Sequence, residues 1–202
     1  MCHSKIRRVF AGLGAAVMLA LPSCSPTALA ADPTDDMIRT AVELTEEYDL
    51  PDGLILAVCE TESDFDPSCV TGKCKGIMQI HSSYASGFAK AAGMDSYDLL
   101  DYADSMRIGA YLLSDYLDRY QGDIHFCLMA YNLGEYGALS KRRNGVSSTG
   151  YSRKVIGRMD KWAQTQVSAD ATAEIEETQE AAALKERIAG AIHEMVREVL
   201  FK

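Results

Sequence analysis

The chain of 202 residues is long enough for one ordinary domain with short appendages. Hydrophobic residues make up 48% and charged residues 24% of the sequence, which are proportions of a globular protein and exclude disorder of the whole chain. The formal net charge of −9 argues against nucleic acid as a partner, because phosphate binding depends on clustered Lys and Arg.

Residues 1–30 have the features of a signal peptide. Basic residues stand at the start, an apolar run follows at 9–21, and small residues end the segment, so we expect cleavage after Ala30 and export to the envelope or the medium. A retained membrane anchor is an alternative, although the run is short for a bilayer. A lipoprotein at Cys24 is another, and Pro22 fits that pattern badly. Without residues 1–30, 17 Lys and Arg face 29 Asp and Glu.

Four cysteines lie beyond the export segment. Cys69 and Cys74 occur in one short loop, so a disulfide between them is possible in an exported protein. Cys59 and Cys127 fall on apolar faces of predicted helices and can be buried thiols. A zinc site of all four is an alternative, but the second pair is 68 residues apart, whereas paired zinc ligands are usually separated by a few residues.

Apolar residues recur at helical spacing through most of the chain, and no stretch shows sustained strand alternation. The sequence therefore predicts a mainly α fold in which strands are minor. A loop rich in Lys, Arg, Gly, Ser and Asn is expected at 141–150. Helices are predicted at 36–48, from a cap at Asp52 through Cys59, from a cap at Ser82 to Gly93, and at 103–120, 124–131 and 151–162.

The composition changes near Gln164, where Ala, Glu, Gln and Thr begin to dominate. We therefore expect a helical domain at residues 31–165, followed at 166–202 by an acidic linker and an amphipathic helical tail. The tail either packs back on the domain or is solvated. An envelope or secretion-apparatus partner that binds the tail helix is a weaker alternative, because the segment is poor in Lys and Arg.

The most informative stretch for chemistry is the end of the second predicted helix. An apolar run ends in carboxylates at Glu60 and Glu62, and Pro67 then forces the chain out of helix. A carboxyl group at the end of an apolar helix can be partly desolvated, which raises its pKa and lets it donate a proton near neutral pH. Glycosidic cleavage needs such a donor at the leaving oxygen.

Three further segments contribute phenol or amide side chains, two of them beside a glycine, and such side chains suit a sugar site. They are Gly76-Ile77-Met78-Gln79-Ile80, Ala130-Tyr131-Asn132-Leu133-Gly134, and Tyr151 with Val155. Together with Glu62-Ser63, and in this order, they resemble the soluble lytic transglycosylase family, relatives of goose-type lysozyme. The resemblance covers about residues 50–162.

The resemblance implies a lysozyme-like helical domain with a catalytic cleft and no cofactor or metal. It implies cleavage of the β-1,4 bond between N-acetylmuramic acid and N-acetylglucosamine in peptidoglycan, with 1,6-anhydro products. Glu62 would act first as acid and then as base, and Tyr151 would hydrogen-bond near it. The other residues that would line the cleft are Ser63, Met78, Gln79, Tyr131 and Asn132.

The chain departs from the family pattern at Glu135 and Tyr136, where relatives often have small residues or Pro. One alternative activity is a hydrolase of the same fold, which would call for a second carboxylate across the cleft. Asp64, Asp66 and Asp104 are present, but nothing in the sequence places one of them opposite Glu62. A non-catalytic peptidoglycan-binding protein is the other alternative.

Overall fold

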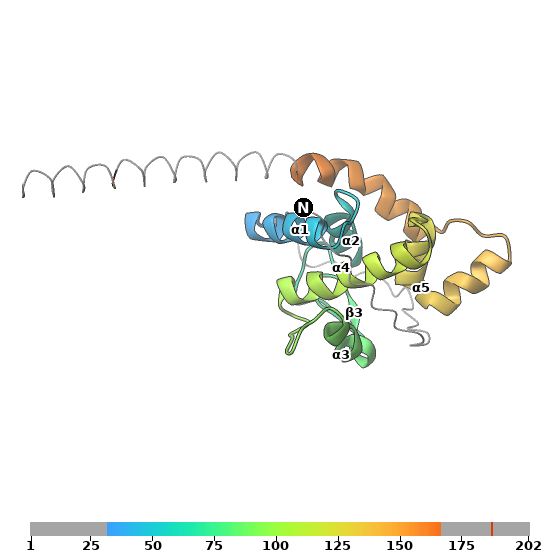
Figure 1. Ribbon diagram of the computed structural model, residues 1–202, viewed down its shortest axis with the longest axis horizontal. Helices are drawn as coiled ribbons and strands as arrows, with labels where there is room; N and C mark the ends of the chain where they lie inside the picture. Colours follow the sequence, from blue (N-terminus) through green and yellow to red (C-terminus); the bar gives the residue numbers. More distant parts are fainter. Residues whose placement is uncertain (1–31, 167–186, 188–202) are drawn as a thin grey trace, which may run out of the picture.

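The computed structural model describes residues 32–166 and the single position 187. The expected signal peptide lies outside the described residues. So does nearly all of the expected tail, including the amphipathic helix considered as a binding site for a partner. The described part is mainly helical, as predicted, with a three-stranded sheet of two-residue strands (Figure 1). Its elements are α1 (Asp35–Glu47), α2 (Leu54–Glu62), β1 (Val70–Thr71), β2 (Cys74–Lys75), β3 (Ile80–His81), α3 (Ser82–Ala91), α4 (Tyr102–Arg119) and α5 (Ile124–Arg143), and residues 150–166 form a further helix.

The start of α2 differs from the prediction. Gly53, not Asp52, is the N-cap, and no side chain caps the helix there. Gly53 has a φ of 74°, and a Cβ at this position would overlap the Met159 carbonyl oxygen, so only glycine allows the close approach. The Gly53 amide instead donates to the side-chain oxygen of Gln166. The tertiary contact thus replaces the local cap that the sequence predicted.

The two helices that contact β3, α3 and α4, begin close to where the sequence placed them. The N-cap of α3 is His81, whose Nδ1 accepts the Ser83 amide at 3.3 Å, so the predicted cap Ser82 is the first helical residue instead. Asp101 caps α4 by accepting the Asp104 amide at 3.0 Å. Each cap satisfies an amide in the first turn that has no partner within the helix.

The sheet is an antiparallel meander in the order β1-β2-β3, with Thr71 opposite Cys74 and Cys74 opposite His81. The structure contains no disulfide between Cys69 and Cys74, although the sequence allows one. Cys74 is a thiol, and the sulfur of Cys69 lies 3.9 Å from the Thr71 hydroxyl oxygen.

The second half of α5 was not predicted. The helix continues to Arg143, so the polar loop is shorter than expected and spans 144–149. Gly134 interrupts α5 with a φ of 70° and a ψ of 156°, which is a kink and not an end. A glycine can adopt this conformation, and the helix resumes after it.

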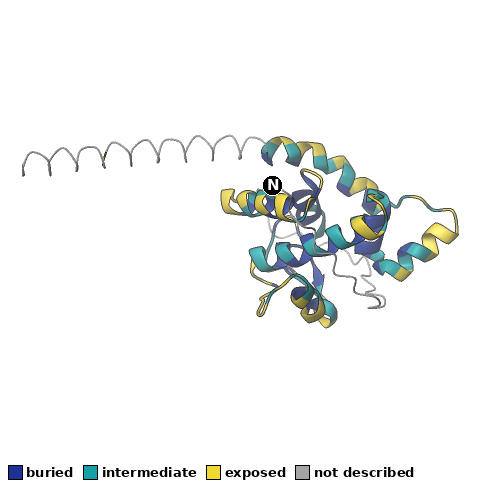
Figure 2. Cartoon of the chain, viewed as in Figure 1, coloured by how far each residue is buried: buried dark blue, intermediate teal, exposed yellow. Residues whose placement is uncertain are grey.

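The core is centred on α2, whose residues from Leu54 to Cys59 are completely buried. The neighbouring helices α1 and α4 pack against it, and Figure 2 shows buried positions along α2 and exposed ones on the outer face of α1. A helix that is apolar all round belongs in a core. Within the described part of the chain, no helix combines the length and apolarity needed to cross a membrane.

Candidate active site

Glu62 is the last residue of α2, where the chain turns sharply away from the helix axis. Ser63 is the C-cap, and the next two residues, Asp64 and Phe65, both have positive φ, 56° and 63°. Pro67 follows and prevents the helix from resuming. The carboxyl group of Glu62 therefore stands at the end of a buried helix and is itself partly exposed.

Tyr151 reaches this carboxyl group from the first turn of the 150–166 helix. Its hydroxyl donates a hydrogen bond to Oε1 of Glu62 at 2.6 Å, and the two residues are 89 positions apart in the sequence. The contact expected from the sequence is present. It exists because the 150–166 helix, orange in Figure 1, packs on α2.

Several side chains hold that helix against the end of α2. The indole nitrogen of Trp162 donates to Oε2 of Glu60 at 2.7 Å, and Nη1 of Arg158 donates to the Thr61 hydroxyl at 2.9 Å. The rings of Phe65 and Trp162 meet edge to face with centroids 5.1 Å apart. Glu60 thus fixes the helix that carries Tyr151, a role that sequence reasoning missed because its partners lie about a hundred residues away.

The pKa of Glu62 is raised from its ordinary value to about 7. Burial is the largest cause, because removal of water disfavours the ionised form. The hydrogen bond from Tyr151 and the positive charge of Lys154 lower the pKa, but together they do not offset burial. Near neutral pH this carboxyl group is therefore partly protonated and can donate a proton.

Four of the residues expected to line the cleft are buried, and we call them the framework residues. Ser63, Met78, Gln79 and Tyr131 are all at most 5% exposed. The Ser63 hydroxyl donates to the Ile77 carbonyl at 2.7 Å, and the Tyr131 hydroxyl donates to the Met78 carbonyl at 2.8 Å. The hydroxyl groups of Ser63 and Tyr131 therefore both bind the backbone of the segment between β2 and β3.

Two amide side chains remain as candidates for direct contact with a sugar. The Gln79 amide nitrogen donates to the carbonyls of Cys69 and Gly76, at 3.0 and 2.9 Å, while no described residue donates to its amide oxygen. Asn132 is 8% exposed, and its side chain forms no hydrogen bond within the described chain. The substrate-binding roles of these two residues, and those expected for Ser63, Met78 and Tyr131, stay predictions.

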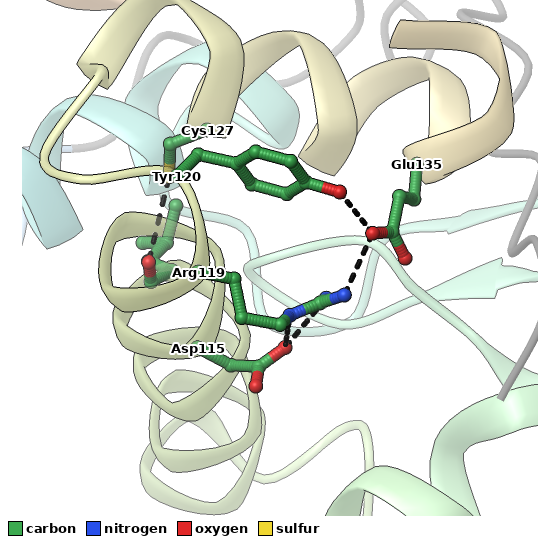
Figure 3. Close-up of polar contacts among 6 residues, drawn as sticks. Asp115, Arg119, Tyr120, Cys127 and Glu135 are labelled. Carbon is green, nitrogen blue, oxygen red and sulfur yellow. Dashed lines mark hydrogen bonds and ion pairs between the residues drawn. The ribbon is translucent and has the colours of Figure 1, made fainter. Parts of the chain in front are cut away.

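A second tyrosine–glutamate pair joins the end of α4 to the kink of α5. Glu135, the residue after Gly134, accepts hydrogen bonds from the Tyr120 hydroxyl and, at 2.7 Å, from Nη1 of Arg119 (Figure 3). Arg119 also binds Asp115 at 2.7 Å. These contacts join the second half of α5 to the end of α4.

A comparison with known protein families matches residues 39–152 to the family described as Transglycosylase SLT domain. This chain belongs to that family. Its members are typically lytic transglycosylases. The match includes Glu62, Tyr151 and the framework residues described above.

The fold of the SLT domain is also found in a solved structure. It is similar to the X-ray structure of an inactive mutant of lytic transglycosylase Slt from Pseudomonas aeruginosa, with a TM-score of 0.59 and 19% sequence identity. The match covers 65% of this chain and 24% of that chain, so this chain spans about a quarter of the length of that protein. The likeness confirms the predicted lysozyme-like helical fold.

Among the described residues, no carboxylate is one of the groups that shift the pKa of Glu62 in this SLT domain. The groups that shift its pKa are Tyr151 and Lys154. Of the acidic residues considered from the sequence, Asp66 accepts from the amide and hydroxyl of Ser68, and Asp104 accepts from the Asp98 amide. Among residues 32–166, no three His, Cys, Asp or Glu side chains are grouped as a metal site.

Proposed function

We propose that this protein is a peptidoglycan lytic transglycosylase in which Glu62 is the only acid and base. It cleaves the β-1,4 bond between N-acetylmuramic acid and N-acetylglucosamine. The observation that carries the proposal is a single carboxyl group with a pKa of about 7, hydrogen-bonded to Tyr151, in a chain of the SLT family. A hydrolase of this fold would call for a second carboxylate, and among the described residues none is a cause of the Glu62 pKa shift.

The reaction proceeds in two steps with one carboxyl group. Glu62 first donates its proton to the glycosidic oxygen as the bond to the anomeric carbon breaks, and N-acetylglucosamine leaves as an alcohol. The resulting carboxylate then accepts the proton of the muramyl 6-hydroxyl, whose oxygen bonds to the anomeric carbon. No water is consumed, the product is a 1,6-anhydro sugar, and Glu62 ends protonated as it began.

Tyr151 has two effects in this scheme. Its 2.6 Å hydrogen bond fixes one oxygen of Glu62, which orients the other toward the substrate. Its hydroxyl also stabilises the carboxylate between the two steps, because a donated hydrogen bond favours the ionised form. The inactivity of the Pseudomonas aeruginosa Slt mutant, in which a glutamate is replaced by glutamine, supports an essential glutamate in this fold.

We infer that the protein acts outside the cytoplasmic membrane, because its substrate lies there. The basic start, apolar run and small residues of 1–30 support export, with removal of this segment after Ala30.

Mass spectrometry of the products released from purified peptidoglycan by residues 31–202 tests the proposal. We expect muropeptides that lack one water and end in 1,6-anhydro groups. Reducing ends would instead identify a hydrolase, and the absence of any soluble product would contradict an enzymatic function.

A further inference from the structure

The charges of this protein are strongly segregated along the chain. Residues 32–140 contain twenty Asp and Glu against six Lys and Arg. Residues 141–161 contain seven Lys and Arg against Asp160 alone. The segment that leads from the end of α5 into the last helix is therefore basic in a protein that is otherwise acidic.

Three of the seven cations are used within the fold. Arg142 forms an ion pair with Asp123, and both Arg158 and Lys161 face Glu60. The other four are exposed and have no carboxylate within ion-pair distance in the described chain. We call these four the basic rim: Lys141, Arg143, Arg153 and Lys154.

One member of the basic rim, Lys154, is electrostatically coupled to the proposed catalytic residue, Glu62. Lys154 lies one helical turn after Tyr151, and its charge lowers the pKa of Glu62, so the ammonium group acts directly on the site. Arg153 donates a hydrogen bond to the Ser148 hydroxyl at 2.9 Å, which ties the 144–149 loop to the last helix.

The far end of the rim adds an exposed aromatic ring. The Arg143 guanidinium carbon lies 6.0 Å from the centre of the Tyr136 ring, and Tyr136 is 66% exposed. A tyrosine ring offers an apolar face and a hydrogen-bonding tip, which suits a polymer that carries both sugars and peptides. Tyr136 is one of the two positions at which the chain departs from the family pattern.

We propose that the basic rim binds the carboxylates of the stem peptides on the peptidoglycan strand that is cleaved at Glu62. This inference rests on the proposed function and names the part of the substrate recognised beside the glycan. In a peptide-bearing strand the lactyl groups are amide-linked, so the negative charges of the polymer are on the peptides. The rim attracts these charges, whereas the acidic remainder of the domain repels them, and a strand is thus oriented as it approaches.

The experiment measures binding in the Glu62→Gln background, which removes turnover and the titration of the catalytic residue. The ligands are soluble peptide-bearing glycan strands and the same strands with their carboxylates converted to amides. Two rim variants, Lys141→Gln with Arg143→Gln and Arg153→Gln with Lys154→Gln, are compared with a control, Arg39→Gln with Lys90→Gln. Each of the three loses one Lys and one Arg, all exposed, so the change in net charge is the same.

We expect each rim variant to bind the native strands about fivefold more weakly at low salt, since each exposed charge pair contributes modestly. The control should bind as the parent does. Amidated strands should bind parent and variants equally, and the differences should vanish near 1 M salt, where screening is short-ranged. Thermal melting of each variant verifies that it is folded.

Two results would overturn the inference: rim variants that bind like the control, or a loss that is equal for native and amidated strands. Neither result affects the proposed function, which depends on the 1,6-anhydro products of the Glu62 enzyme. Conversely, products with reducing ends together with carboxylate-dependent binding would contradict the proposed reaction and support the proposed role of the basic rim.

Discussion

A tyrosine–glutamate pair lies at the end of α2 and another at the end of α4, and the pKa values of the two glutamates are shifted in opposite directions. At each end a tyrosine hydroxyl donates a hydrogen bond to a glutamate, Tyr151 to Glu62 and Tyr120 to Glu135. The pKa of Glu62 is raised to about 7, whereas the pKa of Glu135 is lowered from its ordinary value. A tyrosine partner alone therefore does not decide the ionisation of a glutamate.

Two differences separate the glutamates: Glu62 is more deeply buried, and Glu135 has the guanidinium of Arg119 beside it. For both glutamates burial is the largest cause and raises the pKa. At Glu135 the hydrogen bonds from Tyr120 and Arg119, together with the Arg119 charge, outweigh burial. At Glu62 the cation of the described chain that lowers the pKa is Lys154, and its charge does not outweigh burial. The surroundings of Glu135 thus favour the ionised carboxylate, whereas those of Glu62 favour the protonated form, which can donate a proton.

The largest expected effect is on turnover. Glu62→Gln should reduce the rate of peptidoglycan cleavage by at least about 1,000-fold, because the amide can act neither as acid nor as base. Glu135→Gln should stay within about threefold of wild type. Release of 1,6-anhydro muropeptides measures both rates. Equal losses in the two folded variants would remove the proposed distinction between the sites.

The same two substitutions should change stability in opposite directions. A carboxyl group whose folded pKa is raised weakens the fold as pH rises from its unfolded value near 4.5 through about 7. Glu62→Gln should therefore raise the free energy of unfolding at pH 8 by about 2 kcal/mol and leave it unchanged at pH 4.

Glu135 has a lowered pKa, so its contribution is present above the unfolded pKa and is lost as pH falls. Glu135→Gln should cost about 1 kcal/mol at pH 8 and little at pH 3. Urea denaturation at the three pH values measures both effects. Destabilisation by Glu62→Gln at pH 8 would contradict the raised pKa of Glu62.

Substitution of the two tyrosines should distinguish a role in orienting the catalytic carboxyl group from a role in stabilising the fold. Tyr151→Phe should lower kcat about tenfold, since Glu62 loses the donor that orients it. The substitution also removes an interaction that lowers the pKa of Glu62, so the alkaline fall in activity should move to higher pH. Tyr120→Phe should leave kcat unchanged and cost about 1 kcal/mol of stability. An unchanged kcat in Tyr151→Phe would contradict its role.

The smallest expected effect concerns the cation beside Glu62. Activity requires protonated Glu62 and should fall as pH rises through about 7. Lys154→Gln removes a charge that lowers this pKa, so the fall should move to higher pH by less than about one unit. Arg119→Gln, which acts on the other glutamate, should not move it. A kcat/KM profile from pH 5 to 9 for both variants decides the comparison.

Most of the helices could be predicted from the sequence because their apolar spacing is local. The predicted 103–120 helix is α4 within one residue at each end, and Gly93 follows α3 as expected. The predicted cap of α2 at Asp52 was wrong, because a distant residue, Gln166, binds the amide of Gly53. The continuation of α5 past Gly134 was missed, since a glycine marks a kink and a helix end equally well.

The sequence by itself determined the family, through Glu62 and the ordered segments that follow it, and it determined the helical fold through periodic burial. Only the tertiary structure decided how each charge behaves. Burial, the approach of Tyr151 from 89 residues away and the pairing of Glu135 with Arg119 all depend on how α2, α4, α5 and the last helix pack. A pKa is set by what surrounds a group in space, and that surrounding is absent from the order of residues along the chain.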